Sequence, residues 1–346
     1  MIMHPKSAPV YNMDRLFEAV SERGHVCVGL DTASEYIPER ERSRASTDAE
    51  AVLAYNKAVV NATIDIAACF KVQIAYYEEM GLAGLVTYAA TLRYIRAKGA
   101  LAIADIKRGD IADTASRYAR AHFDGEFEAD FATLTPYLGM DSIEPWLRWA
   151  DEKGKGAFVL MRTSNRGRRD FEELELAAPQ GDCGTERSGG HVPAGRKLYD
   201  AVGDRLSELA ADRLGKHGYG AFGAVVGADP QSPSEREEAA AIRAKRPTLF
   251  FLIPGYGAQG GAASDAALLF REGNGGVVNA SRSILRAWQA ADGVDPASVD
   301  NAAAALAARQ AAIRMRDEIH HAIHHLPRDA ARDAIPGAAG GSGSSR

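Results

Sequence analysis

Two acids and a lysine gather in one short stretch of the chain, ADIKRGD, residues 104–110. Asp105 and Lys107 lie two residues apart at the end of an apolar run, so strand alternation predicts that both side chains share a face while Ile106 points away. Asp110 then begins the next segment. Flanking carboxylates favour the charged form of a lysine. The cluster therefore predicts a fixed, protonated lysine that acts as a general acid toward a carbon centre; a solvated turn after a strand is the alternative.

Polar residues also interrupt three other apolar runs near their ends. Asp31 closes HVCVGLD, Lys71 lies within ACFKVQIA, and Ser164 follows AFVLMRT. An unpaired buried charge is costly, so a purely structural protein has little reason to place charges there. Each residue alone could belong to an ion pair or a turn, but their repetition at strand ends favours a functional site.

Two loops carry groups suited to an anion. The glycines of PGYGAQGG, residues 254–261, let the backbone approach a ligand and expose its N–H groups. NASRS, residues 279–283, opens a helix, where free N–H groups and an arginine bind phosphate. No Walker or Rossmann glycine pattern competes with these loops. The candidate substrate-binding residues in the two loops are Gly257, Gln259, Ser281 and Arg282.

The elements that must position these residues alternate along the chain. Eight short apolar runs are typical of strands buried on both faces of a parallel sheet: His25–Asp31, Ala68–Ala75, Ala100–Lys107, Ala129–Thr135, Ala157–Thr163, Ala221–Gly227, Thr248–Pro254 and Gly276–Ala280. Segments of helical period lie between them: Asp48–Ile66, Glu78–Lys98, Ile111–His122, Ser142–Glu152, Gly195–Lys216, Ser234–Lys245 and Ala262–Arg271. This order favours an α/β fold, a (β/α)₈ TIM barrel, over a three-layer sandwich. In such a barrel the carboxyl ends of the strands build the active site, and the loops after strands seven and eight bind phosphate.

We expect one catalytic domain over residues 14–290, with a long insertion at 165–194 that forms a loop or lid on the active-site face. A helical extension follows at 291–327, with its periodic pattern over Ser298–His325, and a flexible tail at 328–346. Four histidines of this helix have i,i+4 spacing that could bind a metal, but no acid or cysteine completes a site, so a solvated helix end is the better interpretation. They are His320, His321, His324 and His325.

Composition excludes several classes of protein. The 346 residues carry a formal net charge of -5, which argues against non-specific nucleic-acid binding. No apolar run approaches the ~20 residues of a membrane span, and the first residues lack the apolar core of a signal peptide. Cys27 and Cys69 fall inside apolar runs and are predicted to be reduced, buried side chains. We therefore expect a cytoplasmic protein.

The stretch Asp105–Ile111, followed by Thr114, resembles the DxKxxDIxxT signature of the orotidine 5'-phosphate decarboxylase family. The resemblance extends from about residue 31 to residue 283. RTSN, VNASRS and the long insertion resemble the second, bacterial-type branch of that family. The other matching positions are Asp31 and Lys71 on the first two strands, Ser164 at the pyrimidine, and Gln259 and Arg282 at the phosphate.

The resemblance implies a homodimer in which Asp110, Ile111 and Thr114 complete the partner's site. It also implies loss of CO₂ from C6 of orotidine 5'-monophosphate (OMP) to give UMP, without metal or organic cofactor. Lys107 would protonate C6. Because the carbanion at C6 has no evident electron sink, the protein must supply stabilisation on the order of 20 kcal/mol. Magnesium-dependent sugar-phosphate enzymes share the Asp-x-Lys-x-x-Asp core, but Lys71 would repel a cation where they hold their metal. A phosphate-ligand sensor without chemistry is the other rival.

Overall fold

Eight parallel strands close into a barrel in the computed structural model, which describes residues 10–177, 195–228, 232–257, 262–290 and 295–325. The order around the barrel is β1-β10-β9-β8-β5-β4-β3-β2. The predicted (β/α)₈ barrel is confirmed, and the open sandwich is wrong. The barrel strands are β1 (Val26–Gly29), β2 (Cys69–Gln73), β3 (Leu101–Arg108), β4 (Phe131–Leu134), β5 (Gly156–Arg162), β8 (Phe222–Val226), β9 (Phe251–Ile253) and β10 (Gly276–Ala280).

Helices surround the barrel, and α3 and α9 begin at side-chain caps. The Thr47 hydroxyl accepts a hydrogen bond from the Glu50 amide at the start of α3, and Ser232 does the same at α9. The helices between strands are α2 (Glu39–Arg42), α3 (Asp48–Thr63), α4 (Ala75–Glu78), α5 (Gly81–Ala97), α6 (Ala112–Phe123), α7 (Glu144–Lys153), α8 (Leu198–Ala211), α9 (Pro233–Lys245) and α10 (Ala263–Ala267). The short helix α11 (Arg282–Leu285) follows the last strand, β10. Short 3₁₀ turns are η1 (Ser34–Tyr36), η2 (Met140–Ser142), η3 (Arg166–Asp170), η4 (Ala287–Ala290) and η5 (Pro296–Ser298).

The barrel interior alternates large and small side chains. The rings of Phe131 and Phe158 lie with centroids 5.3 Å apart across neighbouring strands. A Cβ at Gly223 would lie 2.2 Å from the Phe250 carbonyl oxygen, so only glycine fits there. Cys27 and Cys69 are buried, unbridged partners on β1 and β2, as expected. Dense packing of this kind holds the strand ends in fixed relative positions.

The amino-terminal helix α1 (Asn12–Arg23) was not among the predicted elements. The Asn12 amide nitrogen of the backbone donates to the Gly154 carbonyl at 2.7 Å, and the Asn12 side chain donates to Asp130, just before β4. Asn274, just before β10, donates to the Phe17 carbonyl. These contacts attach α1 to residues that precede strands, at the barrel end opposite the strand carboxyl ends.

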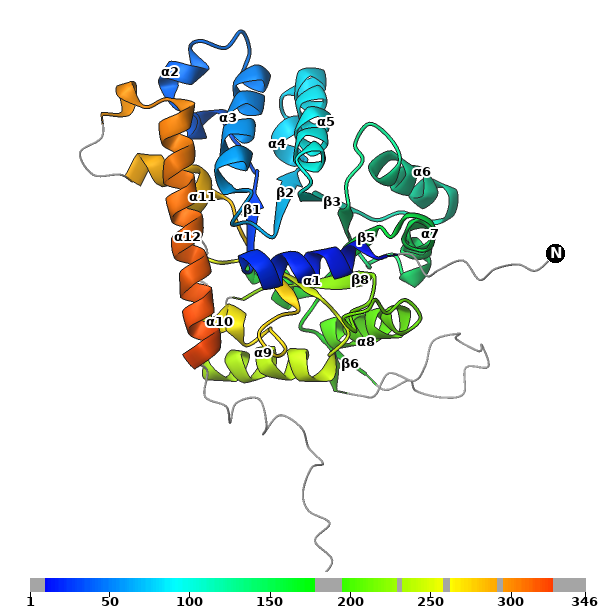
Figure 1. The fold of residues 1–346 in the computed structure, drawn as a ribbon. Coiled ribbons are helices and arrows are strands. Elements are labelled where there is room, and N and C mark those ends of the chain that lie inside the picture. The colour runs from blue at the N-terminus through cyan, green and yellow to red at the C-terminus, as the bar shows by residue number, and fades with distance from the viewer. Residues whose placement is uncertain (1–9, 178–194, 229–231, 258–261, 291–294, 326–346) are drawn as a thin grey trace, which may run out of the picture.

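The carboxyl-terminal helix α12 (Asn301–His325) packs along α3, α10 and α11 on the outside of the barrel (Figure 1). Arg309 forms a two-pronged ion pair with Asp65. On the exposed helix end the rings of His321 and His325 stack, whereas those of His320 and His324 meet edge to face, with their Nε2 atoms 3.1 Å apart. The division of the chain near residue 290 stays a prediction.

The insertion after β5 contains structure that the sequence did not suggest. Within its described part, η3 is followed by β6 (Glu175–Leu176), which pairs antiparallel with β7 (Arg196–Lys197). Residues 178–194 of the insertion, and the predicted tail at 328–346, lie outside the described residues.

Candidate active site

A cavity of about 300 Å³ opens at the carboxyl ends of the barrel strands. Its charged lining consists of Asp31, Lys71, Asp105, Lys107 and Arg282. Ser164 and Ser281, the remaining predicted residues in it, lie on the loops after β5 and β10. Seven predicted site residues, separated by up to 251 positions in sequence, therefore meet in one cavity.

The floor of the cavity is a chain of alternating charges. Lys71 Nζ lies 3.2 Å from Asp31 Oδ1 and 2.8 Å from Asp105 Oδ2, and Lys107 Nζ lies 2.6 Å from Asp105 Oδ1. The side chains of Lys71 and Asp105 are 6% and 7% exposed, whereas that of Lys107 is 48% exposed. Lys107 is thus the end of the chain that faces into the opening, with Asp105 behind it.

Burial and the paired charges act in opposite directions on the two innermost groups. Burial raises the pKa of the Asp105 carboxyl, but Lys71 and Lys107 outweigh it and bring the net pKa well below its usual value. Burial lowers the pKa of Lys71, but Asp105 and Asp31 outweigh it and bring the net pKa above its usual value. Both groups are therefore charged throughout the neutral range.

Lys107 reaches the cavity through a β-bulge. The β3–β4 register shifts between Ala104 and Arg108, and Lys107 has φ of +46°. The predicted placement of Asp105 and Lys107 on one face is confirmed, but the reason given for it, regular strand alternation, is wrong. The bulge turns the Lys107 side chain back over Asp105, and Ile106 is buried.

Two residues that touch this charge chain were missed by the sequence analysis. Gln73 Nε2 donates to Asp105 Oδ2 at 2.9 Å, and the Thr133 hydroxyl donates to Asp105 Oδ1 at 2.9 Å. Gln73 lies two residues after Lys71 on β2, so alternation from Lys71 could have identified it. Thr133 is the one polar residue within β4, FATL, and that isolated hydroxyl was the available signal.

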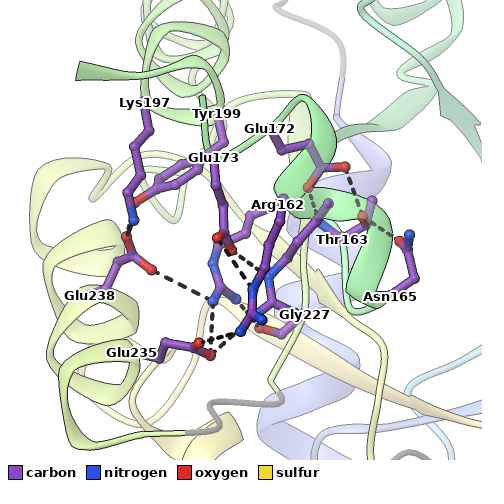
Figure 2. Close-up of polar contacts among 12 residues, drawn as sticks. Arg162, Thr163, Asn165, Glu172, Glu173, Lys197, Tyr199, Gly227, Glu235 and Glu238 are labelled. Atoms are coloured by element: carbon purple, nitrogen blue, oxygen red, sulfur yellow. Dashed lines mark hydrogen bonds and ion pairs between the residues drawn. The ribbon is translucent and has the colours of Figure 1, made fainter. Parts of the chain in front are cut away.

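The loop that carries Ser164 is preceded by a polar network around the buried Arg162. Figure 2 shows the residues of this network. The residue before Ser164, Thr163, donates its backbone N–H and its hydroxyl to the two carboxylate oxygens of Glu172, at 2.8 and 2.7 Å. Arg162, 1% exposed, lies between Glu235 and Glu238 of α9 at 3.7 and 3.6 Å. The network fixes the loop's backbone between the insertion and α9.

The predicted anion-binding residues are only partly brought together. Ser281 and Arg282 line the cavity, and the Ser281 hydroxyl is buried without a hydrogen-bond partner among the described residues. A Cβ at Gly29 would lie 1.9 Å from that hydroxyl oxygen, which explains the glycine at the end of β1. Gly257 does not line this cavity but lies beside Ser283 in an adjoining one. Gln259 lies outside the described residues.

Asp110, Ile111 and Thr114 do not line the cavity of their own chain. The Asp110 carboxylate accepts the Ile111 backbone N–H at 2.8 Å, and Ile111 is 52% exposed. Thr114 is also exposed, on the first turns of α6. These three residues therefore lie outside the cavity that the rest of the motif builds.

The described residues supply neither a metal-binding cluster nor a membrane-spanning helix. No group of three or more His, Cys, Asp or Glu side chains in the described ranges is arranged to hold a metal ion. No helix in the part of the chain that the structure describes is long and apolar enough to cross a membrane.

Similar proteins agree with the motif and the geometry. A family model described as "Orotidine 5'-phosphate decarboxylase / HUMPS family" matches residues 24–184. Orotidine 5'-phosphate decarboxylase of Clostridium perfringens (strain 13 / Type A) is 52% identical over 309 residues, which cover 89% of this chain and 98% of the relative. The enzyme of that name from Clostridium acetobutylicum is 46% identical over 307 residues, 89% of this chain and 98% of its own. The structure of Leishmania donovani OMP decarboxylase is 31% identical, with a TM-score of 0.64, and the match covers 91% of this chain and 99% of that one. The chain belongs to the orotidine 5'-phosphate decarboxylase family.

Proposed function

We propose that this protein decarboxylates OMP to UMP and CO₂ in de novo pyrimidine biosynthesis, without a metal or an organic cofactor. The observation that carries the proposal is the continuous chain Lys71–Asp105–Lys107 on the floor of a cavity whose rim holds Arg282. The similar proteins named above support the same activity. The buried, unbridged Cys27 and the pyrimidine pathway favour a cytoplasmic location.

The reaction breaks the bond between C6 and the carboxylate carbon, and the electron pair stays on C6. CO₂ leaves, and the Lys107 ammonium stabilises the negative charge and then transfers a proton to C6. The resulting amine regains its proton from solvent, to which Lys107 is half exposed. Asp105 holds Lys107 in place, and Lys71 fixes Asp105 from the other side. Repulsion between Asp105 and the substrate carboxylate would add ground-state destabilisation.

Binding energy from the remote end of the substrate would close and orient the site. Arg282 would pair with the phosphate, with Gln259 and the N–H groups near Gly257 alongside it. Ser281 lines the same cavity next to Arg282, which supports a ligand contact there. Ser164 would contact the pyrimidine, and Asp31, beside Lys71, would bind a ribose hydroxyl.

We further propose a homodimer in which Asp110, Ile111 and Thr114 enter the partner's cavity. Their position outside their own cavity supports this arrangement. Large apolar side chains are exposed on the adjoining loop after β4, where Tyr137 is 79% and Leu138 49% exposed. Exposed apolar patches of this kind mark protein–protein contacts. In the dimer, Asp110 of one subunit would follow Lys107 of the other and extend the alternating charges.

The proposal is tested by following OMP absorbance with purified protein in excess EDTA. We expect full turnover with EDTA, and no turnover in Lys107→Ala prepared in the same way. Absence of turnover by wild-type protein contradicts the decarboxylase. Turnover only after addition of magnesium favours the metal-dependent relatives, and OMP binding without turnover favours a sensor.

A further inference from the structure

We propose that Thr133 is the positioning residue of this site: its hydroxyl holds the β3 bulge that aims Lys107 and orients Asp105. The inference rests on the proposed role of Lys107 as the proton donor. Thr133 does not line the cavity, so it acts on the reaction only through these two residues.

The Thr133 hydroxyl is fully used and its polarity is fixed by its partners. Its oxygen accepts the backbone N–H of Ile106 at 2.9 Å and that of Lys107 at 3.0 Å. Its proton is donated to Asp105 Oδ1 at 2.9 Å, the same oxygen that Lys107 Nζ contacts. A hydroxyl offers one donor and two acceptor sites, and all three are occupied here. Thr133 is 1% exposed, so water does not replace these bonds.

The hydroxyl replaces strand pairing where the barrel ladder is interrupted. Ala104 pairs with Ala132 and Arg108 with Leu134, so three residues of β3 lie opposite Thr133 alone. Backbone N–H groups in such a gap need another acceptor, and Thr133 provides one for two of them.

Lys107 adopts a backbone conformation that needs this support. Its φ of +46° is in the left-handed region, which costs a residue with a Cβ about 1–2 kcal/mol. If the β3 backbone were regular, Lys107 would have ordinary strand dihedral angles, and its ammonium would lie elsewhere. The Thr133 oxygen bonds the Lys107 amide in the strained conformation, and the Thr133 proton holds the carboxylate against which Lys107 rests.

The expected consequence of losing the hydroxyl is slower chemistry with little loss of substrate binding. Arg282 and Ser164 lie on the loops after β10 and β5 and line the cavity, whereas Thr133 lies on β4 and does not. Displacement of a reacting group by about 1 Å costs roughly 100-fold in rate. We therefore expect Thr133→Val to lower kcat about 100-fold while KM changes little.

The test compares Thr133→Val, Thr133→Ala and Thr133→Ser with a matched control. Thr63 is equally buried, and its hydroxyl donates to the Val59 carbonyl at 2.8 Å on α3, away from the cavity. Thr63→Val should keep wild-type kcat. Thr133→Ser should recover most of the activity because it retains the hydroxyl. Circular dichroism shows whether each variant is folded. If Thr133→Val does not fold, Thr133→Ala takes its place as the variant without a hydroxyl.

Hydrogen exchange provides a readout that does not need activity. The amides of Ile106 and Lys107 should exchange faster in Thr133→Val and at the wild-type rate in Thr133→Ser. Wild-type kcat in a folded hydroxyl-free variant, a serine variant as slow as alanine, or unchanged exchange of both amides would overturn the inference. If the wild-type protein does not turn over OMP, the proposed function fails, and exchange still decides whether Thr133 holds the bulge.

Discussion

Replacing Lys71 with methionine should destabilise the protein through Asp105 and also abolish activity. The change removes the charge between Asp31 and Asp105 and leaves both carboxylates in place. Removing one partner of a buried ion pair costs about 3–5 kcal/mol. Asp105 retains Lys107 and Thr133, so we expect the low end, about 3 kcal/mol. At about 2–4 °C per kcal/mol, Tm should fall by roughly 6–12 °C.

The cost should depend on pH in a defined direction. Because the pKa of Asp105 is lowered in the folded state, its carboxylate stabilises that state at pH values above the ordinary pKa near 4. This stability is lost as the pH falls below that value. Because the pKa of Lys71 is raised in the folded state, its ammonium stabilises that state at pH values below about 10.4. This stability is lost only at higher pH. Both contributions are therefore complete in wild type at pH 7. Without Lys71 the pKa of Asp105 rises, so protonation near pH 4 relieves the buried charge and the deficit shrinks.

Urea unfolding at pH 4 and pH 7 measures both effects, and Lys155→Met is the matched control. Lys155 has the same 6% side-chain exposure as Lys71, and it pairs with Glu128 at 2.9 Å just before β5, away from the cavity. Glu128 is 30% exposed and keeps Arg96, so this variant should lose less stability and retain its kcat. A Lys71→Met protein as stable as wild type, or with a deficit that grows at pH 4, would refute the reasoning.

Three further outcomes follow from the site. Lys107→Ala should abolish turnover while the free energy of unfolding changes by less than about 1 kcal/mol, because the side chain is half exposed; comparable activity in this variant would remove it as the acid. Glu172→Ala should raise KM for OMP about tenfold by releasing the Thr163 backbone, at about 1.4 kcal/mol for the two hydrogen bonds; steady-state kinetics with an unchanged KM would show that the loop needs no anchor. Gly29→Ala should displace Ser281 and weaken binding of UMP more than that of uridine. Calorimetry measures both affinities, and an equal loss of affinity for the two ligands would show that Ser281 does not act at the phosphate.

The barrel could be predicted because its strands are buried on both faces. Runs such as the one ending at Asp31 are short, apolar and regularly spaced, and few folds other than a parallel α/β barrel or sheet produce that pattern. α1 was missed because it precedes the first strand and lies outside the repeat of strands and helices. The β6–β7 pair was missed because each strand has two residues, too few for a periodic signal.

The charged side chains of the site could also be predicted, but the geometry that aims them could not. Lys71 and Asp105 stand out because charges are rare in buried strands. The bulge at Lys107 depends on a hydroxyl from the neighbouring strand, Thr133, and no local pattern in β3 reports that contact. Gln73 could have been predicted from the sequence, because it lies two residues after Lys71 on the same face of β2.

Mixing two inactive variants tests most directly the claim that the charge network is shared between subunits. Lys107→Ala and Asp110→Asn are each expected to be inactive alone. In a mixed dimer, one site combines an intact Lys107 with the partner's intact Asp110. Random exchange between equal amounts makes half the dimers mixed, each with one intact site, so about a quarter of wild-type OMP turnover should return. Mass spectrometry first shows that the subunits have exchanged. If OMP turnover then does not return, the result contradicts the account.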